Sequence, residues 1–234
     1  MSRSPFISFY YSFDEVCPSP DELSSFLQLD KLDEGHPALE FIDLILPELL
    51  AIKKITGGFS IFDVEELNVK AGQIKLGGAT LQLERQVAGY LKGSVSAALF
   101  LCTAGEEFTR LSDHYTARGD LMEAYLVDAI GSLTAEKAMD RVMHELETMQ
   151  HHRSMHISNR YSPGYCHWPL TDQQTLFQLV GTHNTGITLT PSSLMIPRKS
   201  VSGIIGIGPH LQQQPYGCST CNSRDCIYRR IIQS

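Results

Sequence analysis

The chain has 234 residues, which is long for one ordinary domain, short for two, and enough to bury a core without disulfide bridges. Hydrophobic residues make up 42% of the sequence and charged residues 19%, a balance typical of a globular protein rather than a disordered one. The formal net charge is −7 and basic residues form no block, which argues against a nucleic-acid backbone as partner.

The first residues, MSRSPFISFYYSFDEV, lack the long apolar run of a signal peptide. No stretch approaches the roughly 20 apolar residues of a membrane span. We therefore expect a cytoplasmic protein whose six cysteines are reduced. In that compartment, metal binding or simple burial is favoured over disulfide formation.

Two helices are predicted near the N-terminus. Ser19 can cap the first helix, and Glu22 three residues later completes a capping box. The second helix is expected to follow Pro37 and to continue to Ile55. Pro47 should kink or divide it, because proline removes a backbone donor from the helix.

Glycines and β-favouring residues then predict a change to strands. Gly57 and Gly58 are expected to end the helical region. Residues 59–83 contain segments with partial alternation, and Gly77–Gly78 suits a hairpin turn between two of them. Residues 94–102, SVSAALFLC, are almost continuously apolar, which indicates a strand buried on both faces.

Residues 104–150 are predicted to form successive helices, with breaks at Gly119 and Gly131. Apolar residues recur here at spacings of three and four, which defines a stripe that faces the core. This stripe is interpreted as core packing rather than as a cofactor site, and its members are Met139, Val142, Met143, Leu146 and Met149.

A further helix is predicted from Thr171, which forms a capping-box pattern with Gln174, to Gly181. Residues 187–190 and 201–207 are predicted strands. Strands, then helices, then strands favour an α+β fold in which a helical region packs on a mainly antiparallel sheet.

The sequence contains no internal repeat, linker or compelling domain boundary. We therefore expect residues 1–234 to form a single unit. Within it, residues 1–90 form the N-terminal part and residues 210–234 a cysteine-containing tail.

The segment Arg160–Tyr165 combines residue types that suit a small-ligand pocket. An arginine can bind a carboxylate through two parallel hydrogen bonds. Pro163 and Gly164 predict a turn that leaves backbone N–H and C=O groups available, and Tyr165 offers an aromatic face with a polar tip. From spacing alone, an ordinary surface turn with a solvated arginine remains an alternative.

This turn resembles a motif of the activation domain of cobalamin-dependent methionine synthase, in which an arginine is followed after two residues by Pro-Gly-Tyr. The resemblance continues through residues 188–203, TLTPSSLMIPRKSVSG, and through the helical segment 121–146. In that segment Glu136 corresponds to a ligand-facing carboxylate, although a solvated helix charge is the alternative. The resemblance is specific over residues 160–204 and weak before residue 90.

The resemblance implies binding of S-adenosylmethionine and a role in reactivating methionine synthase, and thus in methionine biosynthesis. Arg160 would anchor the ligand carboxylate, Ser162 and Gly164 would supply backbone contacts, and Tyr165 would border the approach of the corrin ring. Glu136 would lie near the sulfonium or the amine. An electron from flavodoxin or ferredoxin would reduce cob(II)alamin before its methylation.

Two departures from the family pattern bear on the partner. The large fused enzymes continue past the SVSG segment with a strand whose tyrosine helps to hold the ligand, and Tyr216 cannot be assigned that role. The chain therefore looks like a shorter, free-standing branch of the family. The Asp-x-His-x-x-Gly motif for cobalamin's lower ligand is missing, and Asp113 and His114 are adjacent. We therefore expect cobalamin to arrive on a partner methionine synthase. This chain would be an in-trans component of a cobalamin-dependent methyltransferase, not an independent methyltransferase.

The C-terminal tail carries Cys218, Cys221 and Cys226 in a CxxCxxxxC pattern, which can converge on zinc or an iron–sulfur cluster. Candidates for a fourth ligand are Cys166, His167 and Cys102. Three reduced thiols in a tail are the simpler alternative. If the cysteines do bind metal, a second functional hypothesis is a non-catalytic metal-binding or electron-relay adaptor for a corrinoid protein.

Overall fold

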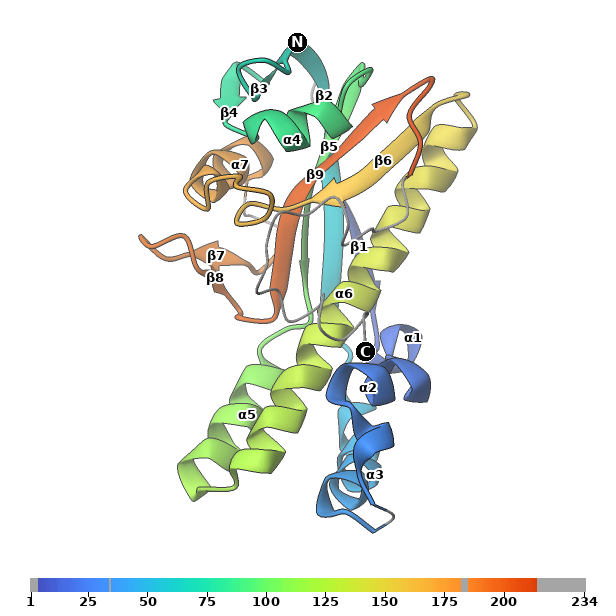
Figure 1. The fold of residues 1–234 in the computed structure, drawn as a ribbon, viewed down its shortest axis with the longest axis vertical. Coiled ribbons are helices and arrows are strands. Elements are labelled where there is room, and N and C mark those ends of the chain that lie inside the picture. The colour runs from blue at the N-terminus through green and yellow to red at the C-terminus, as the bar shows by residue number, and fades with distance from the viewer. Residues whose placement is uncertain (1–3, 34, 182–184, 214–234) are drawn as a thin grey trace.

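The computed structural model describes residues 4–33, 35–181 and 185–213, which form a twisted sheet with helices on both faces (Figure 1). The strand order is β4-β3-β2-β5-β9-β6, and β1 also pairs with β2. Every neighbouring pair is antiparallel, which confirms the predicted α+β fold with a mainly antiparallel sheet. The strands of this sheet are β1 (Ile7–Tyr11), β2 (Ile55–Asn68), β3 (Gln73–Leu76), β4 (Ala79–Leu81), β5 (Ser96–Thr103), β6 (His156–Tyr161) and β9 (Ser200–Gly208).

The remaining elements are helices and a small separate hairpin. The hairpin consists of β7 (Thr188–Leu189) and β8 (Met195–Ile196). In Figure 1 the long helix α6 crosses the sheet diagonally and continues beyond it beside α5. The helices are α1 (Phe13–Val16), α2 (Pro20–Leu27), the 3₁₀ helix η1 (Leu29–Lys31), α3 (Pro37–Leu49), α4 (Glu84–Tyr90), α5 (Glu107–Arg118), α6 (Leu121–His151) and α7 (Asp172–Val180).

The central strand β5 divides the core into two layers, because successive side chains of a strand point to opposite faces. Residues of one parity, Ala98, Phe100 and Cys102, pack with α6 and the N-terminal helices. Residues of the other parity, Ala97, Leu99 and Leu101, pack with α4, α7 and the β3–β4 hairpin. The prediction of a strand buried on both faces is thus confirmed.

The N-terminal helices agree with the sequence only in part. The capping box of α2 is confirmed: the Ser19 N–H donates to Glu22 Oε2 over 2.8 Å, and the Glu22 N–H donates to Ser19 Oγ over 3.2 Å. The second helix is not divided at Pro47, which lies in the last turn of α3. It ends at Leu49 rather than at Ile55, where β2 already begins.

The prediction that Gly57 and Gly58 end a helix is wrong, since both lie inside β2. Both are positions of close approach between elements. A Cβ atom on Gly57 would lie 2.8 Å from Val142 Cγ2 of α6, and one on Gly58 would lie 2.1 Å from the Ile7 carbonyl oxygen of β1. The hairpin turn at Gly77–Gly78 is confirmed between β3 and β4, with φ angles of 55° and 79°.

The helical region has one of the two predicted breaks. Gly119 ends α5 in the left-handed conformation, as expected. Gly131 does not break α6, because it is a contact position: a Cβ atom there would lie 2.7 Å from Phe108 Cβ of α5. The apolar stripe of α6 is confirmed as core, with Met139, Val142 and Leu146 fully buried.

The helix predicted near Thr171 is α7, but Thr171 makes no side-chain cap. Gln174 instead ties the β7–β8 hairpin to the helix, since its Nε2 donates to the Thr190 carbonyl over 3.1 Å and to Ser193 Oγ over 3.3 Å. β1, β6, β8 and α4 were not predicted. Within the described ranges, no helix combines the length and the apolar character that crossing a membrane requires.

Candidate functional site

Arg160 lies near the end of β6, directly opposite Ile205 of β9. Cross-strand partners project to the same face of a sheet, and Ile205 packs in the layer that contains α6. The guanidinium therefore reaches α6, where Nη1 donates to Asp140 Oδ1 over 2.6 Å and Nη2 donates to Glu136 Oε2 over 2.7 Å. These three residues are called the Arg160 cluster below.

The Arg160 cluster is partly exposed, and the arginine is its least exposed member. The arginine side chain is 17% exposed, whereas Glu136 is 42% and Asp140 54% exposed. The carboxylates are four residues apart on α6, so they lie one above the other on the same helix face. One cation held by two carboxylates gives the cluster a formal charge of −1, which suits a ligand with its own positive charge.

The structure thus brings together Arg160 and Glu136, which the sequence identified separately. Asp140 was missed. The sequence pattern that could have identified it is the spacing of four residues between Glu136 and Asp140, which places both acids on the same face of the predicted helix, where one cation can contact both.

The Pro-Gly turn after β6 is closed by its own backbone. The Gly164 N–H donates to the Trp168 carbonyl over 2.8 Å, and the Tyr165 N–H donates to the Ser162 carbonyl over 3.2 Å. The Trp168 N–H in turn donates to the Tyr165 carbonyl over 2.9 Å. The amide N–H groups of Gly164 and Tyr165, expected to be available to a ligand, are therefore already in use.

This turn contains three residues in the left-handed region: Gly164 at φ 94°, Cys166 at 50° and His167 at 66°. For a residue other than glycine this conformation costs roughly 1–2 kcal/mol. Such a turn persists only where its surroundings hold it in place.

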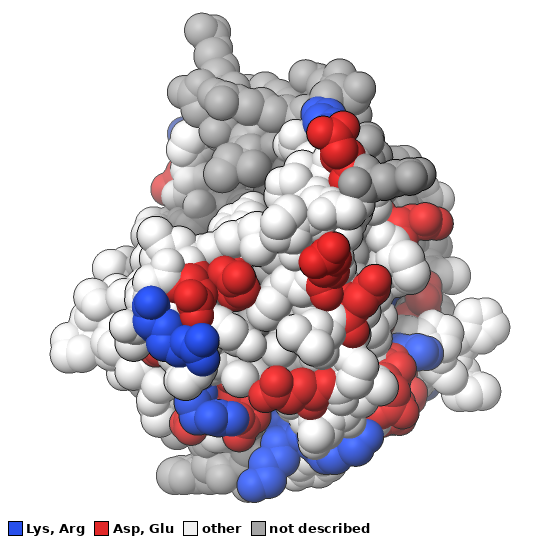
Figure 2. All heavy atoms as spheres, turned by 90° about the horizontal axis from the view of Figure 1, so that it is seen from below, with Lys and Arg blue, Asp and Glu red and all other residues white. Residues whose placement is uncertain are grey.

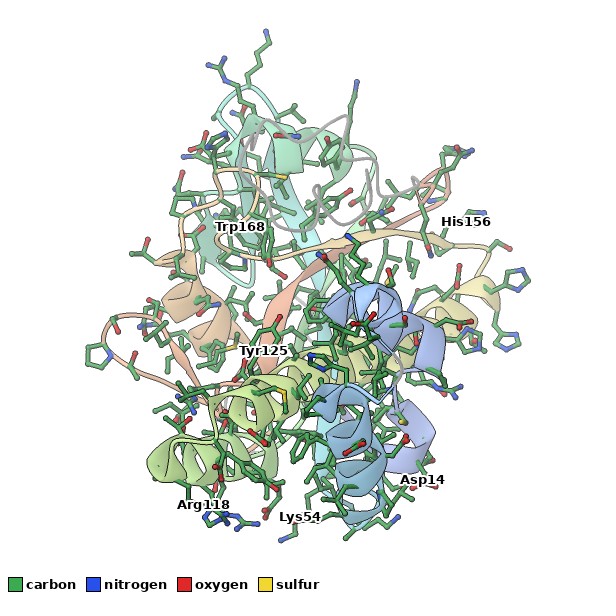
Figure 3. All side chains as sticks on the ribbon, turned by 60° about the horizontal axis from the view of Figure 1, so that its bottom comes forward. Asp14, Lys54, Arg118, Tyr125, His156 and Trp168 are labelled. Atoms are coloured by element: carbon green, nitrogen blue, oxygen red, sulfur yellow. The ribbon has the colours of Figure 1, made fainter. Side chains whose placement is uncertain are left out.

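Trp168 supplies that restraint. Its side chain is 1% exposed and packs in the core layer of α7 (Figure 3). Its indole N–H donates to Asp172 Oδ2 over 2.8 Å, and the same oxygen accepts from the Gln82 N–H. Neither Trp168 nor Asp172 was identified from the sequence, although Trp168 is the only tryptophan of the chain.

The anchored turn presents Tyr165 to solvent. This side chain is 65% exposed, and Leu170 nearby is 40% exposed. The position of a Cβ on Gly164 lies 3.8 Å from Leu170 Cδ1, so the turn and this leucine are adjacent. The result is an exposed aromatic and aliphatic surface next to the end of β6.

Strand β6 pairs with only part of the edge of β9. The two strands pair from His156 opposite Gly208 to Tyr161 opposite Ile204. Beyond that point a Cβ on Gly203 would lie 2.0 Å from the Tyr161 carbonyl oxygen, so only glycine lets β6 approach β9 this closely. The Arg160 cluster therefore lies close to where the two strands separate.

A second charged contact joins α6 to the segment before β9. Lys199 Nζ lies 2.7 Å from Asp128 Oδ1 and 3.0 Å from Ser132 Oγ. This pair holds the helix against the sheet nearer the N-terminal end of α6, away from the Arg160 cluster.

The predicted metal ligands are only partly described. Cys218, Cys221 and Cys226 lie outside the described residues. Cys102 is fully buried, with its thiol 3.9 Å from the Ala135 carbonyl, and burial raises its pKa to about 12. A thiol held protonated in this way is a poor metal ligand. Within residues 4–33, 35–181 and 185–213, no three His, Cys, Asp or Glu side chains converge as a metal site would require.

The surface charge is mixed where it is seen from below. Figure 2 shows Asp and Glu side chains spread over this face and Lys and Arg gathered toward its edge. The described part of this face therefore offers no continuous basic surface of the kind that follows a nucleic-acid backbone.

Comparison with known proteins identifies the family and the fold. Residues 87–227 match the family model described as "Vitamin B12 dependent methionine synthase, activation domain". The fold is similar to a solved structure described as "Crystal Structure of the MetH Reactivation Domain bound to AdoHcy", with a TM-score of 0.62 and 18% sequence identity over 92% of this chain and 81% of that chain. A search of curated proteins found no match.

Proposed function

Because this chain belongs to the activation-domain family of vitamin B12 dependent methionine synthases, we propose that it binds S-adenosylmethionine and supports reductive methylation of cob(II)alamin on a partner methionine synthase. The fold is similar to that of a reactivation domain bound to S-adenosylhomocysteine, the product of such a methyl transfer, which supports the proposal. The chain would act in trans as a cytoplasmic component of the methyltransferase.

The reaction needs an electron and a methyl group but no proton. Flavodoxin or ferredoxin supplies one electron, which reduces the partner's cobalt from the +2 to the +1 state. The cobalt then attacks the methyl carbon of S-adenosylmethionine; a cobalt–carbon bond forms, and the sulfur keeps the electron pair of the broken carbon–sulfur bond. Since no proton moves, this chain contributes by holding and orienting the methyl donor.

The observation that carries the assignment is the position of Arg160 between two carboxylates at the start of the Pro-Gly turn. The two carboxylates restrain the guanidinium, which is only 17% exposed, and departure of Glu136 from Nη2 would leave that nitrogen for the ligand carboxylate. Glu136 is 42% exposed, so it can leave the arginine and face the ligand ammonium or sulfonium. The Arg160 cluster would thus supply both the contact with the ligand carboxylate and the contact with a positively charged group of the ligand.

The turn has a different task. The N–H groups of Gly164 and Tyr165 and the Ser162 carbonyl are used internally, so the contacts proposed for Ser162 and Gly164 fall to the Ser162 hydroxyl and the Gly164 carbonyl oxygen. Tyr165 is exposed on a turn that Trp168 anchors, and its ring would border the incoming corrin. Because the backbone of this turn is already fixed, docking of a flat partner on the ring would cost side-chain entropy but little backbone entropy.

Titration calorimetry with S-adenosylmethionine tests the site. Arg160→Ala should weaken binding at least about tenfold, which corresponds to about 1.4 kcal/mol. Arg160→Lys should give an intermediate affinity, because an ammonium keeps the charge but not the planar fork. Arg110→Ala is the matched control, since this arginine also pairs with a carboxylate, Glu107, but on the exposed surface of α5. Equal affinity of wild type and Arg160→Ala would remove Arg160 from the site.

The function itself is tested by reconstitution. The purified chain is mixed with S-adenosylmethionine, a reductant and a cobalamin-loaded methionine synthase that lacks its own activation domain. Methylcobalamin should form, as followed by its absorption spectrum, and should not form when the chain is left out. A preparation that binds the methyl donor but never yields methylcobalamin would refute the role in reactivation.

Metal binding by Cys218, Cys221 and Cys226 is a separate proposal, supported by their spacing. Elemental analysis and the visible spectrum of anaerobically purified protein distinguish zinc, an iron–sulfur cluster and free thiols. Loss of the metal in a triple Cys→Ser variant would assign it to these residues.

A further inference from the structure

The two carboxylates of the Arg160 cluster contact different nitrogens of the guanidinium. Asp140 Oδ1 is 2.6 Å from Nη1, and Glu136 Oε2 is 2.7 Å from Nη2. One contact can therefore be released while the other is kept. If Glu136 turns toward a ligand, the contact with Asp140 still holds the guanidinium in place.

The nearby cations of α6 do not cancel the charge of the cluster. Lys137 extends to Glu22 of α2, with its Nζ 2.8 Å from Oε1. The Arg141 guanidinium lies 3.4 Å from the Glu15 carbonyl oxygen of α1. Both side chains thus serve contacts with the N-terminal helices, and the Arg160 cluster keeps its formal charge of −1.

This charge distinguishes the methyl donor from its product. S-adenosylmethionine carries a sulfonium, an ammonium and a carboxylate, a net charge of +1, whereas S-adenosylhomocysteine has lost the sulfonium charge and is neutral. The loaded site is then neutral with the donor and −1 with the product. Without the Asp140 charge, the site would be +1 with the donor and neutral with the product.

We propose that Asp140 is a positioning residue that keeps Arg160 oriented while Glu136 engages the ligand, and that its charge makes the site prefer the sulfonium donor over the demethylated product. This inference rests on the proposed function. It predicts that methyl transfer itself weakens the hold on the ligand, because the transfer removes the positive charge that the cluster complements. Product release is thereby favoured without a separate device.

The test measures the dissociation constants of both S-adenosylmethionine and S-adenosylhomocysteine for wild type and for Asp140→Asn, which keeps the size of the side chain. In Asp140→Asn, the preference for S-adenosylmethionine over S-adenosylhomocysteine, measured as the ratio of the two dissociation constants, should fall about three- to tenfold. This is the size expected for one partly screened charge. Asp140→Glu should restore the wild-type ratio. The shift should shrink in 1 M salt.

Asp128→Asn is the matched control. Asp128 is an acid on the same helix that also pairs with a cation, Lys199, but it lies about 18 Å from Asp140 along the helix axis. That separation exceeds the screening length of about 8 Å at physiological salt, so the ratio should not change.

The outcomes separate this inference from the proposed function. If wild type binds neither compound, both fail. If wild type binds the donor but Asp140→Asn weakens both compounds equally, Asp140 only supports the structure and the charge preference is overturned. If the ratio shifts as strongly in Asp128→Asn, the effect belongs to overall charge rather than to the Arg160 cluster, and the inference is again overturned.

Discussion

Replacing Trp168 by phenylalanine should destabilise the protein by about 3 kcal/mol, because it removes a hydrogen bond that holds the Pro-Gly turn. In wild type the Asp172 carboxylate, which is buried, accepts from the Trp168 indole and from the Gln82 N–H. Loss of one donor to a buried charged group costs about 1.5–3 kcal/mol. The smaller ring adds about 1 kcal/mol through lost apolar contact.

Urea unfolding followed by far-ultraviolet circular dichroism measures this effect. Fluorescence is unsuitable, since Trp168 is the only tryptophan and the substitution removes the signal. The midpoint should fall with an unchanged m value, and the melting temperature should fall by roughly 6–12 °C for a chain of this length. Tyr125→Ala serves as a control at a side chain that is exposed on α6 and labelled in Figure 3. It should change stability by less than about 0.5 kcal/mol.

The same variant tests the link from the turn to the ligand. If Trp168 holds the left-handed turn, Trp168→Phe should also weaken S-adenosylmethionine binding while the protein is still folded. A loss of stability below about 0.5 kcal/mol would show that the Trp168–Asp172 contact does not restrain the turn. Unchanged affinity in a clearly destabilised variant would separate the turn from the binding site.

Two further predictions concern helix packing and pH. In thermal unfolding, Gly131→Ala should destabilise the protein by about 1–3 kcal/mol despite the better helix propensity of alanine, because the new Cβ would lie 2.7 Å from Phe108 Cβ. The control Gly89→Ala in α4, whose new Cβ would have no atom within 4 Å, should be neutral or stabilising by up to about 1 kcal/mol. The reverse order of the two effects would contradict the packing argument. Burial raises the pKa of Cys102 from 9.0 to about 12, so between these pH values the folded state keeps a proton that the unfolded state releases. The stability of wild type relative to Cys102→Ala should therefore be constant below pH 9 and fall as the pH rises from 9 toward 12. A stability difference that stays constant over that window would show that the thiol is not held protonated.

Local features of the sequence were enough to predict several elements. The capping box of Ser19 and Glu22, the Gly77–Gly78 turn and the left-handed end at Gly119 each depend on residues within a few positions of one another. The apolar run of β5 and the stripe of α6 also follow from periodicity, because a buried face repeats regularly along one element. The Arg160 motif was likewise recognisable from consecutive residues.

Only the tertiary structure decided what depends on elements far apart in the chain. Gly57 and Gly131 look like helix breakers in sequence, but they are contact positions whose partners, Val142 and Phe108, come from other elements. No local pattern shows that Trp168 and Asp172 restrain the Pro-Gly turn, since the restraint also needs Gln82 from a distant segment.

The candidate site shows the same division. The sequence by itself determined that Arg160 begins a Pro-Gly turn and that acids of suitable spacing lie on a helix. It did not determine that β6 would place the guanidinium between Glu136 and Asp140, because that depends on how the strand and the helix pack across the sheet. Residue types and short spacings act locally, whereas the charge balance of the site arises from contacts that form only when the whole domain has folded.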